Sequence, residues 1–106
     1  MNRFSQYKTV QVPISGKMYT LYVADDHEKR IKGLSKIPYM PKRMGMIFIY
    51  PEPVCHAFTM ENTKIPLRII FIDDNFEIIH TVDAKAGQKE EVRPMSDFKY
   101  VTEIPF

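Results

Sequence analysis

The chain has 106 residues, which suits one domain over residues 1–106 with a single modest core. Hydrophobic residues make up 44% of it and charged residues 26%, so a disordered or collagen-like chain is excluded. The formal net charge of +2 is too small to indicate nucleic-acid binding by itself.

Two β-branched and aromatic runs come first in the chain, from Thr9 to Ile14 and from Met18 to Val23. Ser15-Gly16-Lys17 separates them, and a three-residue link that contains glycine is typical of a β-hairpin. Pro13 lacks a backbone donor, so the first strand is predicted to lie at a sheet edge or to bulge there.

A short helix is predicted next, from about Asp26 to Lys32. Asp25 is its expected N-cap, because an acid three residues later completes an arrangement close to a capping box. Gly33 is expected to end the helix. Ile31 and Leu34 are the apolar side chains that we expect to dock on a sheet.

The rest of the chain is predicted to be rich in strands. Ile37 to Gly45 is expected to be an extended loop, and Ala84 to Arg93 a solvated one. The strand-like runs are Met46–Tyr50, Val54–Met60, Leu67–Ile72, Phe76–Val82 and Phe98–Ile104. Asp73-Asp74-Asn75 indicates a tight turn. The predicted fold class is therefore α+β, mainly β: a small antiparallel curled sheet or barrel-like fold with one short helix.

Three motifs stand in a characteristic order along the chain. Gly33-Leu34 closes the helix, Gly45-Met46-Ile47-Phe48 opens a strand, and Met60-Glu61-Asn62-Thr63-Lys64-Ile65-Pro66-Leu67 precedes an apolar strand. From roughly Tyr19 to Ile104, this order resembles the bacterial and archaeal family known as domain of unknown function 192. The resemblance implies a small barrel-like α+β fold and carries no established activity.

Four positions depart from the pattern of that family. Where the family has tryptophan, this chain has Thr59, and where the family has lysine, it has Glu61. Arg68 replaces the aspartate of the family, and Phe76 replaces its glycine after the turn. Glu61 and Arg68 together reverse two charges. One hypothesis is a salt bridge between them with exchanged signs, and the other is a different ligand.

The bend around Asn62 and Thr63 is the candidate binding groove. Apolar side chains that share strand faces are predicted to surround it, with the two polar residues at its rim. The groove residues are Met46, Phe48, Phe58, Met60, Asn62 and Thr63. The same apolar faces suit a hydrophobic core equally well, and Asn62 and Thr63 also suit a turn.

A basic segment between residues 29 and 43 is the second candidate surface. It holds Lys29, Arg30, Lys32, Lys36, Lys42 and Arg43 without an acid among them. Such a segment can meet phosphates or an acidic partner, and it can equally be a solvated surface.

Catalytic signals are weak. Cys55 and His56 are neighbours in a predicted strand, so their side chains point to opposite faces, and a buried thiol with a surface imidazole is the favoured interpretation. The scattered histidines do not fit the spacing of a zinc site, so we predict no metal and no cofactor. No motif of the common enzyme classes is present, and the predicted function is therefore non-enzymatic.

We predict a small binding module whose partner is another protein. The alternatives are nucleic-acid or polyanion binding through the basic segment, and a small-molecule or carbohydrate-like ligand, or an enzyme, at the Asn62-Thr63 groove. Because the single cysteine and the lack of a long apolar run indicate neither an oxidising compartment nor a membrane span, a cytoplasmic location is expected. An open sheet edge near Phe98–Ile104 is expected to allow a dimer as well as a monomer.

Overall fold

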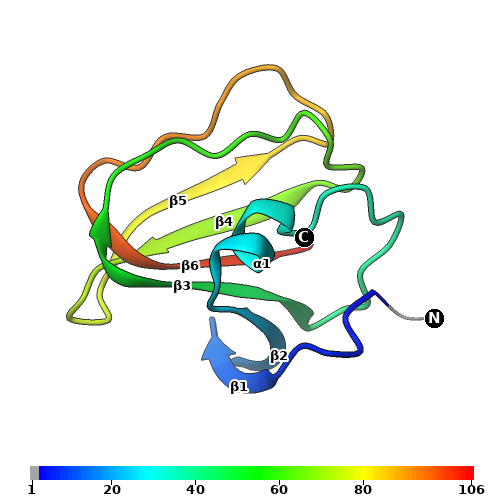
Figure 1. Cartoon of the computed structure of the whole chain (residues 1–106), viewed down its shortest axis with the longest axis horizontal. Helices are drawn as coiled ribbons and strands as arrows, with labels where there is room; N and C mark the ends of the chain where they lie inside the picture. Colours follow the sequence, from blue (N-terminus) through cyan, green and yellow to red (C-terminus); the bar gives the residue numbers. More distant parts are fainter. Residues whose placement is uncertain (1–2) are drawn as a thin grey trace.

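A computed structural model describes residues 3–106 and contains one six-stranded sheet and one short helix (Figure 1). The strands are β1 (Thr9–Ile14), β2 (Lys17–Ala24), β3 (Met44–Val54), β4 (Leu67–Ile72), β5 (Ile78–Ala84) and β6 (Phe98–Ile104), and the helix is α1 (His27–Lys32). Their order in the sheet is β1-β2-β3-β6-β4-β5. The predicted fold class is confirmed: the chain is mostly β with one short helix, and the curled sheet stays open rather than closing into a barrel.

One strand pair differs from the predicted antiparallel arrangement. β2 and β3 are parallel, with Leu21 opposite Gly45, so the sheet is mixed. A parallel pair needs a long crossover between its strands. Here α1 and the loop that follows it, over residues 33–43, supply that crossover.

The first hairpin is confirmed. β1 and β2 pair antiparallel around Ser15 and Gly16, both of which have positive φ. β1 is an edge strand of the sheet, so Pro13 occupies a strand where its missing donor is tolerated.

Helix α1 begins one residue later than predicted. Asp26, not Asp25, is the N-cap: its backbone is extended, and its Oδ1 accepts a hydrogen bond from the Lys29 backbone N–H at 2.8 Å. Gly33 ends the helix with a φ of 47°. Leu34 is buried as expected, whereas Ile31 is 70% exposed, so the prediction that both dock on the sheet is half wrong.

The assignment of Asp26 as the N-cap can be tested by comparing two variants. Asp26→Ala should lower the melting temperature by a few degrees, because α1 loses its capping bond, and Asp25→Ala should change it little. Thermal denaturation followed by circular dichroism measures both. Equal shifts in the two variants would contradict this assignment of the cap.

The region after β3 is the largest error of the sequence-based assignment. β3 extends to Val54, and the predicted strand Val54–Met60 does not form; Phe58 makes only an isolated bridge with Val92. The β3–β6 register shifts between Ile49 and Val54. Two prolines, Pro51 and Pro53, lie in this stretch, and their missing N–H groups interrupt the ladder.

The β4–β5 hairpin forms around the predicted turn. Asp73 Oδ1 accepts hydrogen bonds from the backbone N–H groups of Asn75 and Glu77, each at 2.9 Å. β5 begins at Ile78 rather than at Phe76, because Phe76 has a left-handed backbone with a φ of 63°. The loop after β5 is less solvated than predicted, since Val92 is buried.

Strand β6 has the predicted bounds but not the predicted place. It lies in the middle of the sheet between β3 and β4, so the open edge expected at Phe98–Ile104 is wrong. The edges are β1 and β5. The oligomeric state stays a prediction.

Arg68 pairs with a different acid from the one that we expected. Its guanidinium donates to both carboxylate oxygens of Asp83 on the neighbouring strand, at 2.7 and 2.9 Å. The hypothesis of a salt bridge between Arg68 and Glu61 is therefore wrong. This contact keeps the pKa of the Asp83 carboxyl below its usual range, through the hydrogen bond and the nearby positive charge.

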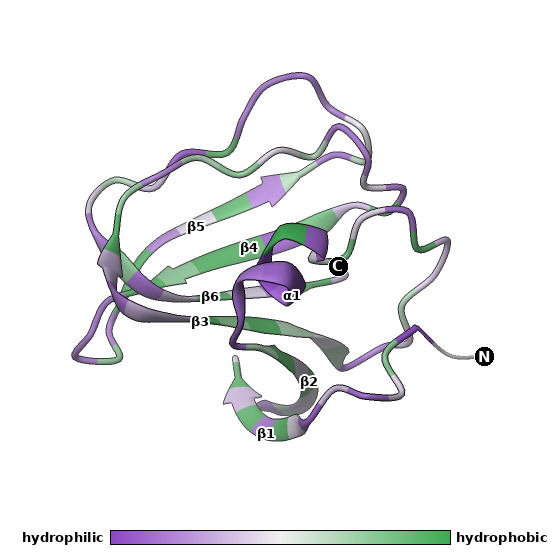
Figure 2. Ribbon diagram, in the orientation of Figure 1, coloured by the Kyte–Doolittle hydropathy of each residue, from purple (hydrophilic) through white to green (hydrophobic). Residues whose placement is uncertain are grey.

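Apolar clusters pack on both faces of the sheet. The larger cluster includes Ile69 and Phe71 of β4, and the smaller one is formed by Leu21, Ile70 and Ile104. Successive residues of β4 thus enter different clusters, one on each face of the sheet. Figure 2 shows the apolar character along β4, and Figure 1 shows α1 in front of the sheet, on one face only.

Within residues 3–106, no helix has the length and apolar character required to cross a membrane.

Candidate functional site

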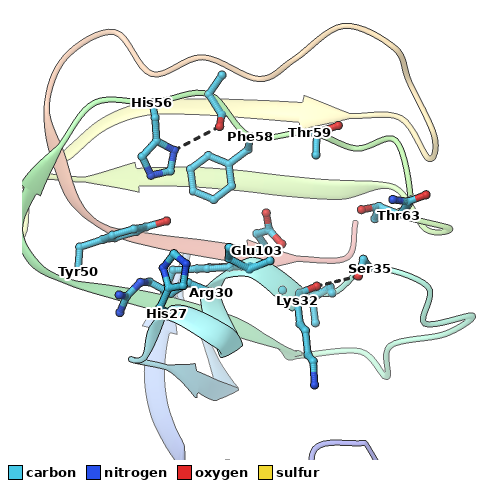
Figure 3. Close-up of a pocket in the computed structure, with 16 residues that line it drawn as sticks. His27, Arg30, Lys32, Ser35, Tyr50, His56, Phe58, Thr59, Thr63 and Glu103 are labelled. Atoms are coloured by element: carbon cyan, nitrogen blue, oxygen red, sulfur yellow. Dashed lines mark hydrogen bonds between the residues drawn. The ribbon is translucent and has the colours of Figure 1, made fainter.

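A pocket of about 470 Å³ lies between α1, the central strands and the segment that follows β3 (Figure 3). The helix side contributes His27, Arg30, Ile31, Lys32, Gly33, Leu34 and Ser35. The sheet contributes Phe48, Tyr50 and Glu103. The segment after β3 contributes His56, Ala57, Phe58, Thr59, Asn62 and Thr63. We call this the α1 pocket.

Glu103 is the buried acid of the α1 pocket. It lies opposite Met46 of β3 and Ile69 of β4, and both of these neighbours are fully buried. Its residue is only 6% exposed, and its carboxyl makes no hydrogen bond or ion pair with any other residue from 3 to 106. Figure 3 shows the carboxyl directed toward the ring of Phe58.

Burial determines the protonation state of this group. Removal from water raises the pKa of the Glu103 carboxyl to about 8. At neutral pH the group is therefore mainly a carboxylic acid, which can donate one hydrogen bond and accept others. A neutral acid that faces a pocket is a typical feature of a functional site.

Aromatic rings form the wall of the pocket beyond Glu103. Phe58 packs edge-on against Phe48, with ring centres 5.7 Å apart, and stacks on the His56 ring at 5.3 Å. Tyr50 and His56 meet edge-on at 5.5 Å. Burial raises the pKa of the Tyr50 phenol to about 12, so this hydroxyl stays protonated and can serve as a neutral donor.

The basic residues of the segment 29–43 do not form one uniform surface. Arg30 turns toward the α1 pocket, where its guanidinium lies 5.0 Å from the Tyr50 ring centre and donates to the Ile49 carbonyl at 2.9 Å. Lys29 and Lys32 form ion pairs with acids of their own helix region.

The remaining bases of that segment, Lys36, Lys42 and Arg43, are exposed on the loop between α1 and β3. Three of the six predicted basic residues thus lie on this loop, whereas the other three are bonded to acids near α1 or to a carbonyl at the α1 pocket. A role of this surface in binding stays a prediction.

The predicted groove is divided by the fold. Phe48, Phe58, Asn62 and Thr63 all line the α1 pocket. Met46 and Met60 are instead fully buried in the core. The pocket thus brings together four of the six residues, and their role in binding remains a prediction.

Sequence reasoning missed the acid at the centre of the pocket, and it missed His27 and Tyr50 as lining residues. The strand of Glu103 carried no clear signal, because the residues that share its face are Lys99 and Val101, one charged and one apolar. A buried acid is nevertheless unusual, and such a position points to function.

The Cys55-His56 pair differs in part from its favoured interpretation. The Cys55 thiol is exposed rather than buried. The exposed His56 contributes its ring to the aromatic wall. Among residues 3–106, no group of three or more histidine, cysteine or acidic side chains is placed to hold a metal ion.

The α1 pocket offers binding groups rather than a pair of catalytic acids. Glu103 is the only carboxyl group among its lining residues in the described part of the chain. Glycoside hydrolysis commonly uses two carboxyl groups on opposite sides of the scissile bond. The pocket's arrangement of one neutral acid, several hydroxyl or amide groups and an aromatic wall is suited to holding a ligand.

Comparisons with known proteins show one family, from a sequence model, and one fold, from two solved structures. The sequence model of the DUF192 family, described as "Uncharacterized ACR", matches residues 10–106. A crystal structure of a protein of unknown function from Novosphingobium aromaticivorans is 24% identical, with a TM-score of 0.84 over 98% of this chain and 78% of that one. A candidate transcription regulator from Sinorhizobium meliloti is 26% identical, with a TM-score of 0.78 over 93% and 81% of the respective chains. No curated protein matches the sequence.

Proposed function

The chain belongs to the DUF192 family, which is described as uncharacterized, and from its α1 pocket we propose that it is a binding module for a small, neutral, carbohydrate-like ligand. The observation that carries this proposal is the buried Glu103 carboxyl, which faces the pocket without a partner among residues 3–106. The carboxyl is open to the space of the pocket, so a ligand hydroxyl can reach it and bond to it there.

Because Glu103 is protonated at neutral pH, we expect its ligand to be uncharged. At neutral pH the acid presents one O–H donor and a carbonyl acceptor, a combination that matches a ligand hydroxyl, which itself both donates and accepts. The bases nearest the pocket are already engaged, since Arg30 donates to a main-chain carbonyl and Lys32 pairs with Glu28. The neutral acid and the hydroxyl and amide groups of the pocket therefore suit a neutral ligand.

The walls of the pocket support a ring-bearing ligand. A sugar ring has an apolar C–H face and an edge of hydroxyl groups. The aromatic rings of Phe58 and Tyr50 suit the first, and the side chains of Thr59, Asn62 and Thr63 suit the second. The volume of about 470 Å³ lies within the usual range for small-ligand pockets.

Nucleic-acid binding has less support. The similarity to a candidate transcription regulator suggests nucleic-acid binding, and the exposed Lys42 and Arg43 are the residues that would contact the nucleic acid. Against it, Lys29 and Lys32 are paired with acids, and Arg30 faces the pocket. A double charge reversal, Lys42→Glu with Arg43→Glu, should leave sugar binding unchanged, because neither residue lines the α1 pocket.

Saturation-transfer NMR with a panel of neutral monosaccharides tests the proposal. We expect binding to the wild-type protein at pH 6 and its loss above pH 8, where Glu103 ionises. Glu103→Gln should bind at both pH values, because its amide also offers a donor and an acceptor. Glu103→Met should lose about tenfold or more in affinity, because its side chain offers neither.

Glu91→Met is the matched control for these variants, since Glu91 is an exposed acid outside the pocket. Its binding should equal that of the wild type. If no monosaccharide binds at either pH, or if Glu103→Met binds as well as the wild type, the proposed function is wrong.

A further inference from the structure

A second and larger cavity lies on the opposite face of the sheet from the α1 pocket. It has a volume of about 980 Å³, and residues of both edge strands, β1 and β5, line it. The two edge strands therefore lie on either side of the same cavity, because the sheet curls around it. We call this space the outer groove.

Aliphatic side chains dominate the outer groove. β1 contributes Val10, Val12 and Ile14, and the central strands contribute Ile47, Ile49, Ile70 and Ile72. Val10 is 39% exposed, and Ile78 on β5 is 64% exposed, so the walls of the groove present apolar surface to water. Apolar surface gathered in a concave space typically marks a binding site.

A buried hydroxyl lies among these aliphatic side chains. Thr102 of β6 is only 1% exposed, and within residues 3–106 its Oγ1 has no hydrogen-bond partner. Thr102 lines the groove, and its side chain lies on the same strand face as those of Tyr100 and Ile104. Such a buried, unpaired hydroxyl is costly, and a ligand group that bonds to it removes the cost.

The groove has no free charge. Its two charged lining residues, Arg68 and Asp83, are bonded to each other by two hydrogen bonds. An ion entering this space would lose water without gaining a free counter-charge. The groove is therefore complementary to an uncharged occupant.

Two stacked aromatic rings line the outer groove. The Phe76 ring stacks on that of Tyr100, with centres 4.9 Å apart and planes 19° apart. Phe76 is 74% exposed and keeps a left-handed backbone with a φ of 63°, which is rare for a bulky residue. Strained backbone of this kind gathers at ligand-binding positions.

We propose that the outer groove binds a small uncharged apolar molecule that carries one hydrogen-bonding group, which meets Thr102. The volume is that of a small-ligand cavity, and the flanking of one concave space by two edge strands suits a compact molecule better than the surface of a second copy. This site is independent of the α1 pocket and of its proposed ligand.

N-phenylnaphthylamine, an uncharged fluorophore with a single N–H donor, is a suitable probe. Its fluorescence should rise on addition of the wild-type protein. Thr81→Trp should weaken binding by at least about tenfold, because Thr81 is an exposed residue of β5 that lines the groove, and an indole there fills the space. Thr102→Val should weaken binding by about threefold to tenfold, because it removes the hydroxyl and keeps the shape.

Two variants serve as controls. Gln11→Trp adds the same ring on β1, at an exposed position that does not line the groove, and Glu103→Met alters only the α1 pocket. Both should bind the probe as the wild type does. No fluorescence rise with the wild type, or equal binding by Thr81→Trp, would overturn the proposal.

Two further outcomes would also count against it. Unchanged affinity in Thr102→Val would overturn the hydrogen bond to the ligand. Conversion of a wild-type dimer into a monomer by Thr81→Trp, seen by sedimentation, would assign the groove to a second copy instead.

Discussion

Gly45→Ala should destabilise the protein by at least about 3 kcal/mol. A Cβ atom at Gly45 would lie 2.3 Å from the Glu103 carbonyl oxygen and 2.9 Å from Cγ2 of Ile104. The first of these atoms is backbone of the central strand and cannot move away without breaking the β3–β6 ladder. Urea denaturation followed by circular dichroism gives the loss in free energy of unfolding.

Gly16→Ala is the matched control for this prediction. No atom lies within 4 Å of a Cβ at Gly16, so its substitution carries only the strain of a φ of +78°, about 1–2 kcal/mol. A loss in Gly45→Ala no greater than that in Gly16→Ala would show that the two central strands can move apart.

Glu103→Gln should remove a large pH dependence of stability. Because burial raises the pKa of Glu103 from 4.5 to about 8, the unfolded chain ionises first as the pH rises. The folded state binds the proton more tightly, so its stability is full below pH 4.5 and falls through pH 8. The slope is about 1.4 kcal/mol per pH unit, and the total is up to about 5 kcal/mol.

The measurement is the free energy of unfolding of the wild type and of Glu103→Gln from pH 4 to pH 9. Groups that titrate equally in both proteins cancel in the difference. We expect the wild type to lose stability relative to the variant as the pH rises, and the exposed Glu91→Gln control to follow the wild type. A difference that does not change with pH would mean that Glu103 ionises in the folded state as it does in water.

Local signals in the sequence were sufficient for most elements of the fold. The bounds of β4 and β6 follow from apolar runs and alternation, and the turn at Asp73 follows from side-chain oxygens that bond nearby amides. The N-cap was misplaced by one residue because Asp25 and Asp26 are both good caps, and only the backbone angles distinguish them.

Long-range pairing could not be read from those signals. The parallel contact of β2 with β3 and the central place of β6 depend on strands distant in sequence. The false strand after β3 had suitable residue types, but the β3–β6 ladder is already interrupted before it, at Pro51 and Pro53 of β3. Asn62 and Thr63, which line the pocket, were singled out from a motif, and their role in binding stays a prediction. Glu103 was missed because its burial depends on Met46 and Ile69, which lie on two other strands.

The central place of β6 has a consequence for how the protein is made. Strands β1 to β3 form one half of the sheet and β4 with β5 the other, and in the described structure β6 alone joins them by backbone hydrogen bonds. A ribosome releases Phe98–Ile104 only after both halves have emerged. Until this segment is available, no strand ladder joins the two halves, and the sides of β3 and β4 that pair with β6 are left open. Chaperone binding during this interval would protect the pieces from pairing with strands of other chains.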